Sequence, residues 1–286
     1  MTCTVLVENS TVSSSLAPQH GLSLLLETGE ETLLLDSGQD DTFAKNAVVL
    51  GKNLSTVTAA VCSHAHYDHA GGFNTFCALN QTAPIYTYWQ PETQCFSTAH
   101  SAPGEPPRFI GWKYDSNCES RIRFADRSAP LKIGKKSWLL PVSVHTFRRP
   151  YKNKALYRVC HDGLHHDDFS HEGILAIETE HENRKGLALF NSCSHNGVIN
   201  SIESVHSFFP DTEIFSYTGG FHFPWDIGEQ IAAEDIAAMQ ELALYATRSR
   251  IQLYTGHCTG EGALACLQPL CGELLHRLHT GLVYSF

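Results

Sequence analysis

The sequence predicts a layered α/β fold, and three features of the chain support this prediction. Apolar runs at residues 22–27 and 32–35 flank a turn that contains Gly29, which is the pattern of a β-hairpin. A segment with helical spacing follows at residues 43–50, and a buried strand is predicted at 57–62. Strands and helices in this order indicate a core in which helices cover a sheet.

The remainder of the chain continues this pattern. Further strands are predicted at residues 4–7, 138–144, 173–178, 187–190, 213–217 and 251–254. The clearest helix spans residues 229–247, with apolar side chains on one face: Ile231, Ile236, Met239, Leu242 and Ala243. A last helix is predicted over residues 263–278, bent near Pro269.

Composition and charge limit the classes of partner. The 286 residues are 42% hydrophobic and 17% charged, as in ordinary globular proteins. The formal net charge of −10 argues against nucleic acid, because phosphate binding needs clustered Lys and Arg. The N-terminus lacks the pattern of a secretory signal, and no apolar run has the length of a membrane span. We expect a cytoplasmic protein with a small-molecule substrate, no membrane partner, and a homodimer as an open alternative.

One segment departs from the periodic pattern. Residues 91–130 are rich in Pro, Ser, Arg and aromatic residues and show no clean spacing. We interpret them as an insertion that covers the active site within a single domain of residues 1–286. The aromatic residues of the insertion are expected to line the pocket: Phe109, Trp112, Tyr114 and Phe124.

The most informative segment directly follows the strand predicted at 57–62. It brings four candidate metal ligands together within six residues: His64, His66, Asp68 and His69. Imidazole and carboxylate together suit zinc, iron or manganese better than calcium. The following Gly71 and Gly72 allow the backbone to turn tightly. A metal centre is therefore predicted here.

Two more histidines follow predicted strands in the same way. His195 follows the strand at 187–190, and His257 follows the strand at 251–254. Loops at one end of a sheet bring together ligands from distant parts of a chain. We therefore count both histidines as candidate ligands.

The ordered set Asp36-Ser37-Gly38, His64-x-His66-x-Asp68-His69, His195 and His257 resembles the motifs of the metallo-β-lactamase superfamily. Residues 20–23, 36–39, 194–197, 219–222 and 255–260 resemble one branch of this superfamily. Its members are labelled dihydropterin-aminobenzene ribofuranosyl phosphate synthases and are linked to methanopterin-type cofactors. The resemblance implies a four-layer αββα sandwich with metals at one edge of two packed sheets.

The resemblance also implies roles for individual residues. It assigns His64, His66 and His195 to one divalent ion, and Asp68, His69 and His257 to a second. Zinc is favoured, with manganese and iron as alternatives. Asp36 would orient the histidine loop from behind the site.

Cys193 stands where many superfamily members have a bridging Asp. Cys193 could be a ligand, His195 could take that place, or the second ion could be held weakly. The sequence leaves these alternatives open.

Three other features allow more than one interpretation. His222 follows a double glycine at a strand end and is a candidate substrate contact, acid–base group or ligand. The basic cluster at residues 148–154 is either an exposed turn or an anion-binding element. Residues 161–168, together with His171, are interpreted as a solvated loop near the mouth of the site.

The chemistry expected from this set is metal-assisted hydrolysis of a small-molecule ester, phosphate ester, phosphodiester or lactone. Asp68 and His222 are the candidate catalytic residues. The alternatives are a mononuclear iron dioxygenase and a non-catalytic metal-containing sensor.

Overall fold

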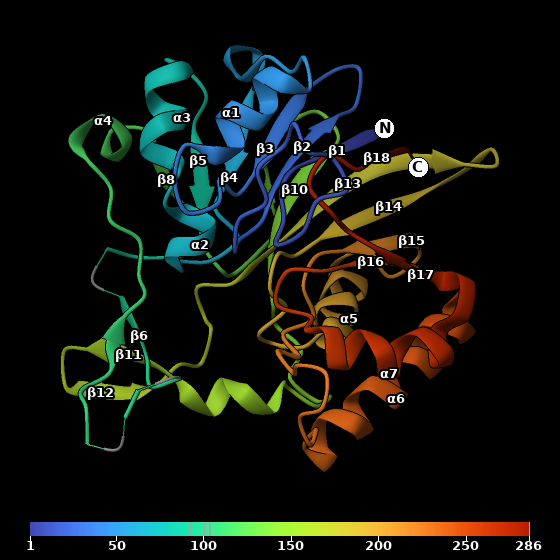
Figure 1. Cartoon of the computed structure of the whole chain (residues 1–286). Coiled ribbons are helices and arrows are strands. Elements are labelled where there is room, and N and C mark those ends of the chain that lie inside the picture. The colour runs from blue at the N-terminus through green and yellow to red at the C-terminus, as the bar shows by residue number, and fades with distance from the viewer. Residues whose placement is uncertain (92, 100, 103, 286) are drawn as a thin grey trace.

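Two seven-stranded sheets pack face to face and carry helices on both outer surfaces (Figure 1). This computed structural model describes residues 1–285 except 92, 100 and 103. The arrangement confirms the predicted four-layer αββα sandwich of the metallo-β-lactamase fold.

The first sheet contains the predicted hairpin and both chain ends. β2 and β3 pair antiparallel, with Leu24 opposite Leu35. β3, β4, β5 and β8 run parallel to one another. The strand order across this sheet is β18 (Val283–Ser285), β1 (Thr2–Val7), β2 (Ser23–Glu27), β3 (Thr32–Leu35), β4 (Ala59–Val61), β5 (Ile85–Thr87) and β8 (Ile122–Phe124).

The second sheet contains the long hairpin β13–β14, which confirms the strand pair predicted at 173–178 and 187–190. β14, β15, β16 and β17 run parallel. The strand order is β17 (Leu275–Arg277), β16 (Gln252–Thr255), β15 (Glu213–Thr218), β14 (Arg184–Phe190), β13 (Gly173–His181), β10 (Ser137–Pro141) and β9 (Leu131–Lys132).

The alternation of side chains along the strands explains the four layers. Leu33 and Leu35 face the second sheet, whereas Leu34 faces the helices of the first half. On β13, Leu175 and its neighbours alternate in the same way between the two sides. Because successive strand residues point to opposite faces, one apolar strand supplies two cores.

Helices cover the outer faces of both sheets. On the first sheet lie α1 (Thr42–Val49), α2 (Tyr67–Ala70), α3 (Phe73–Leu79) and α4 (Ser116–Glu119). On the second lie α5 (Val198–Phe208), α6 (Ala233–Ser249) and α7 (Glu261–Cys271). Single 3₁₀ turns occupy Leu54–Thr56, Tyr151–Ala155 and Gly272–Leu274.

A small third sheet projects from the sandwich below α2 (Figure 1). Its strand order is β12 (Gly163–His166), β11 (Leu156–Cys160), β6 (Gln94–Ser97) and β7 (Arg108–Phe109). An isolated bridge joins Gly111 to His66. The chain leaves the first sheet after β5, forms β6 and β7 of the third sheet, and returns to the first sheet at β8. Strand β8 lies within the predicted insertion of residues 91–130.

The C-terminal helices differ from the sequence-based prediction. α6 begins at Ala233 rather than at 229, and Ile236 is 42% exposed instead of buried with Met239. α7 ends at Cys271 because Gly272 takes a positive φ of 57°. Residues 275–277 then form β17 beside β16, so the predicted helix to 278 is wrong. Along the described residues, no helix combines the length and apolarity that a membrane crossing requires.

We predict that Ile177→Ala destabilises the protein by about 2–5 kcal/mol, because Ile177 is fully buried between the two sheets. Urea unfolding measures the change. Glu180→Ala on the exposed end of the same strand is the control and should change stability by less than about 0.5 kcal/mol. Equal effects of the two substitutions would contradict an inter-sheet core at this position.

Candidate metal centre

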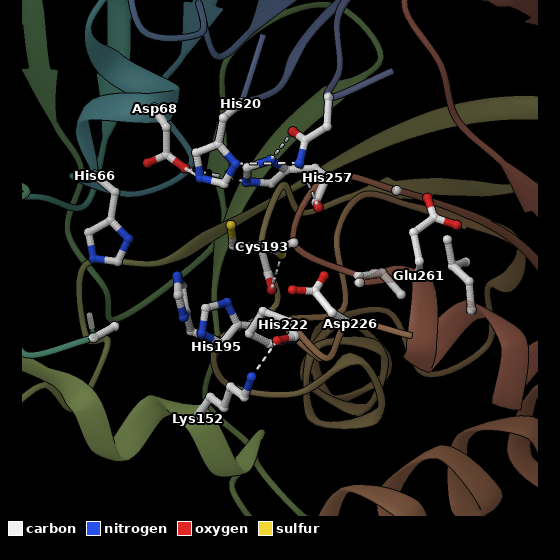
Figure 2. A pocket seen from close by; sticks show the side chains of 18 of the residues that line it. His20, His66, Asp68, Lys152, Cys193, His195, His222, Asp226, His257 and Glu261 are labelled. Atoms are coloured by element: carbon white, nitrogen blue, oxygen red, sulfur yellow. Dashed lines mark hydrogen bonds and ion pairs between the residues drawn. The ribbon is translucent and has the colours of Figure 1, made fainter. Parts of the chain in front are cut away.

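Loops that follow strands of both sheets meet at one edge of the sandwich (Figure 2). β4 leads into the histidine cluster, where His66 precedes the short helix α2. The second sheet supplies the loops after β14, β15 and β16. Side chains from all of these loops point into a common space: His66, Asp68, Cys193, His195, His222 and His257.

The first set of nitrogen atoms belongs to His64, His66 and His195. Their candidate ligand atoms lie within 4.8 Å of one another. The Nε2 atoms of all three are buried and have no hydrogen-bond partner. Because a buried polar atom without a partner is costly, three converging ones fit a metal ion.

Hydrogen bonds at the far side of two of these rings fix their orientation. Asn153 Oδ1 accepts from His195 Nδ1 at 3.1 Å, which leaves the lone pair of Nε2 toward the centre. His64 Nδ1 lies 2.9 Å from Ser63 Oγ, whose own proton is donated to a carboxylate. His64 Nδ1 therefore donates, and its Nε2 is also free to bind a metal.

The second set comprises His69, His257 and Asp68. The Nε2 atoms of the two histidines are 3.0 Å apart, and Asp68 Oδ2 lies 3.6 Å from His69 Nε2 and 3.5 Å from His257 Nε2. Bonds to zinc of about 2.0–2.3 Å in a tetrahedron separate two ligand atoms by roughly 3.3–3.7 Å. His257 Nδ1 donates to Asn9 Oδ1 at 3.0 Å, so its Nε2 lone pair faces Asp68. These spacings fit a second ion.

Asp36 lies behind both sets, as the sequence predicted. It is fully buried, and its Oδ1 accepts the Ser63 backbone N–H at 2.7 Å. Its Oδ2 accepts from Ser63 Oγ at 2.6 Å and from His69 Nδ1 at 2.9 Å. Asp36 therefore orients His69 directly and His64 through Ser63.

His222 and Asp68 differ in their electrostatic surroundings. Burial, followed by a smaller effect of His66, lowers the pKa of His222 to about 3, so this ring is neutral near pH 7. Burial raises the pKa of Asp68, but His69 and a hydrogen bond from His20 outweigh it and hold that pKa well below its usual range. The site thus combines a neutral imidazole with an ionised carboxylate.

A further buried cluster beside His66 contains Cys95, Asp167 and His171. The Ala65 backbone N–H donates to His171 Nδ1 at 3.3 Å, so the ring proton is on Nε2. That proton is donated to Asp167 Oδ2 at 3.1 Å. The cluster is therefore a hydrogen-bond network that supports the histidine loop, because His171 Nε2 has no lone pair to offer a metal.

The interpretation of residues 161–168 as a solvated loop is therefore only partly right. Residues 161–166 are exposed as expected. Asp167 and His171 are instead buried against the histidine loop. The sequence gives no sign that Asp167 and His171 are buried, because the residues immediately before Asp167 form the exposed strand β12.

The centre opens into a cavity of about 860 Å³. Its lining includes three residues of the basic cluster, Tyr151, Lys152 and Lys154, and Lys152 is paired there with Glu229 at 3.3 Å. Residues 91–130 contribute Ala99 and Arg108 to this lining among the described residues.

The aromatic residues of this insertion lie elsewhere. Trp112 packs against Trp89, with ring centres 5.4 Å apart, and Tyr114 packs against Trp112. The prediction that the aromatic residues of the insertion line the pocket is therefore wrong. Trp112 and Tyr114 instead join the core beside α3, Phe109 packs against Phe96 in the third sheet, and Phe124 is 45% exposed.

Several residues that contact the centre were not singled out from the sequence. His20 lies 3.3 Å from Asp68, Asn9 bonds to His257, and Asn153 bonds to His195. Glu172 accepts the backbone N–H groups of His195 and Asn196 and so holds that loop. Only His20 carried a signal, in the segment His20-Gly21-Leu22-Ser23 that resembles the family branch.

Comparisons with known proteins identify similar sequences and a similar fold. A family model described as the metallo-β-lactamase superfamily matches residues 16–88. A 7,8-dihydropterin-6-methyl-4-(β-D-ribofuranosyl)-aminobenzene-5′-phosphate synthase of Methanocaldococcus jannaschii is 25% identical over 285 residues, covering 94% of this chain and 90% of that protein. An uncharacterised protein of the same archaeon is 24% identical and covers 93% of each chain.

Solved structures show the same fold. Tm1679, titled a metal-dependent hydrolase of the β-lactamase superfamily, has a TM-score of 0.78 and 24% identity, with coverage of 100% of this chain and 99% of that one. The metallo-β-lactamase fold protein YhfI of Bacillus subtilis has a TM-score of 0.52 and 12% identity, with coverage of 99% and 98%. The predicted resemblance to the superfamily is confirmed.

We predict that Asp36→Asn weakens metal binding about 10–100-fold, because His69 and Ser63 lose their shared carboxylate acceptor. Competition with a coloured chelator measures the change in affinity. Asp40→Asn is the matched control, since Asp40 bonds to the side chain and N–H of Thr42 at the surface. Wild-type affinity in Asp36→Asn would exclude the orienting role of Asp36.

Proposed function

We propose that this chain, which has the metallo-β-lactamase fold, is a metal-dependent hydrolase of a small-molecule ester, phosphate ester, phosphodiester or lactone. The observation that carries the proposal is the pair of adjoining ligand sets beside a large cavity, the first of which holds three buried nitrogens without a hydrogen-bond partner. Divalent ions bound there would supply a hydroxide near neutral pH and polarise the substrate oxygen.

Individual side chains of the site would have separate catalytic and binding roles. Asp68 is ionised and would hold one ion and orient the attacking water. His222 is neutral, lines the cavity and lies with its ring centre 4.0 Å from that of His195, so it would donate a hydrogen bond to charge that develops on the substrate. Arg108, Lys152 and Lys154 would bind an anionic group at the mouth.

The relative from Methanocaldococcus jannaschii guides the choice of substrates. Its name contains a pterin and a ribofuranosyl phosphate. We therefore propose that a screen of this chain begins with pterin derivatives and sugar phosphates, then phosphodiesters and lactones. Nucleic acid and membranes are not proposed as partners; a cytoplasmic location is proposed, and the homodimer stays an open alternative.

The metal content of the purified protein tests the proposal. Plasma mass spectrometry should find about two zinc ions per chain, and the double variant His66→Ala/His69→Ala should lose them. No bound metal after reconstitution would refute the proposal. Bound metal with a ligand that is returned chemically unchanged would favour a non-catalytic sensor.

One observation favours a different chemistry. His69, His257 and Asp68 are two imidazoles and a carboxylate, the ligand type of mononuclear iron oxygenases. About one iron per chain together with substrate-dependent oxygen uptake would support that second candidate.

We predict that Asp68→Asn lowers kcat at least about 100-fold, because the amide neither carries charge nor orients the water. Steady-state hydrolysis with the best substrate of the screen measures the loss. Asp162→Asn on the exposed β12 hairpin, where the carboxylate contacts His165, should keep wild-type kcat. Full activity and full metal content in Asp68→Asn would refute this role.

A further inference from the structure

Two cysteine sulfurs meet between α3 and α4, among the helices that cover the first sheet (Figure 1). The Sγ atoms of Cys77 and Cys118 are 2.9 Å apart, and both residues are thiols in this structure. Carbon atoms that only touch lie about 3.5–4.0 Å apart, and sulfur is larger than carbon. A disulfide bond of about 2.0 Å would require these sulfurs to close by only about 0.9 Å.

The start of α4 is fixed to the face of α3 that carries Cys77. Asn74 and Cys77 form an i,i+3 pair on α3 and therefore lie on one face of the helix. Asn74 Oδ1 accepts the Asp115 backbone N–H at 3.1 Å. The Asp115 carboxylate accepts the backbone N–H groups of Asn117 and Cys118, each at 3.1 Å, and so caps α4. These contacts set Cys118 opposite Cys77.

Arg121 holds the other end of α4 against α3. Its guanidinium donates to the backbone carbonyls of Cys77, Asn80 and Ala83 at the end of α3. Its backbone N–H donates to the Cys118 carbonyl at 2.9 Å. Polar contacts at both ends of α4 thus hold the two cysteine backbones in place without a covalent bond. Since a disulfide tolerates only a narrow geometry, this fixed approach of the sulfurs prepares the pair for one.

We propose that Cys77 and Cys118 form a reversible disulfide by exchange with a low-molecular-weight disulfide such as glutathione disulfide. The Cys77 thiolate attacks one sulfur of the reagent, and the first glutathione leaves as a thiolate that takes up a proton. The Cys118 sulfur, on losing its proton, attacks the Cys77 sulfur, and the second glutathione leaves. Two protein thiols are thereby oxidised, and the reagent is reduced to two thiols.

The electrostatic surroundings decide which thiol attacks first. The hydrogen bond from the Cys118 thiol has the largest effect and lowers the pKa of Cys77; burial opposes it, and Arg121 adds to the lowering. The same bond, together with burial, raises the pKa of Cys118. Because the thiolate is the nucleophile, Cys77 reacts with the reagent and Cys118 resolves the mixed disulfide.

Local opening of α4 gives the reagent access to the buried sulfurs. α4 is a single turn in which Cys118 is buried, whereas Ser116, Asn117 and Glu119 are exposed. Short exposed elements open at a lower cost in free energy than core strands do. The exchange therefore requires movement of α4 and not the unfolding of a sheet.

The bond would restrain a long segment of the chain. The two cysteines are 41 residues apart, and the segment between them includes β6, β7 and Gly111, which bridges to His66. Closing a loop of this length removes conformational freedom from the unfolded chain. The disulfide form should therefore unfold at a higher temperature than the thiol form.

Incubation of the intact protein in glutathione redox buffers tests the proposal. After acid quenching, alkylation and proteolysis, mass spectrometry should find a peptide pair joined through Cys77 and Cys118. The crosslinked fraction should rise with the ratio of oxidised to reduced glutathione and disappear with excess thiol reductant. The melting temperature of the oxidised protein should rise by roughly 4 °C or more, and reductant should abolish the rise.

Single substitutions separate this pair from the other cysteines. Cys77→Ser and Cys118→Ser should each lose the crosslinked peptide and the rise in melting temperature on oxidation. Cys271→Ser is the matched control and should keep both, because Cys271 is likewise buried on a helix, α7. Circular dichroism checks that each variant is folded, and the crosslink in the wild-type protein is measured without any variant.

The outcomes for this pair are independent of the proposed hydrolase, because neither cysteine belongs to the two ligand sets and the readout is a covalent bond. Cys77 and Cys118 thiols that stay fully alkylated at every glutathione ratio would overturn the disulfide. A crosslink between other cysteines in its place would overturn it as well. Either result would leave the hydrolase proposal intact, and a protein without bound metal could still form the disulfide.

Discussion

The metal centre depends on one buried carboxylate. Asp36 accepts hydrogen bonds from the Ser63 backbone, the Ser63 hydroxyl and His69. The hydroxyl in turn accepts from His64. Because each histidine then carries its proton on the side away from the centre, both Nε2 lone pairs face inward. One residue at the end of β3 thereby orients a candidate ligand in each set.

The residues of the candidate metal centre come from loops of both sheets. The first sheet delivers His64 to His69 after β4, and the second delivers Cys193, His195, His222 and His257 after parallel strands. Apolar side chains between the sheets hold the two edges together. Ions that bridge the edges would stabilise the packed sheets, because the ligands converge only in the folded chain.

Side chains of both charges line the cavity. The net charge is −10, and the cavity lining carries both signs: Arg108, Lys152, Lys154 and Arg277 lie among Glu8, Asp68, Asp226, Glu229 and Glu261. Lys152 is held over the Trp225 ring, 4.0 Å from its centre, and donates to the Pro224 carbonyl. The proposed small anionic substrate could pair with these cations even though the net charge of the chain is negative.

The sequence determined the parts of this protein that depend on neighbours along the chain. The hairpin β2–β3, the strand before His64 and the ligands His64 to His69 are local patterns, since strand periodicity and a short loop place them without reference to distant residues. Tertiary structure decided the rest. It buried His171 beside a strand with exposed side chains, paired residues 275–277 with β16 as a strand, and brought Asn9 to His257 and Cys193 to His69. These contacts join residues far apart in the chain, and their energy comes from packing and shared hydrogen bonds, which no local pattern records.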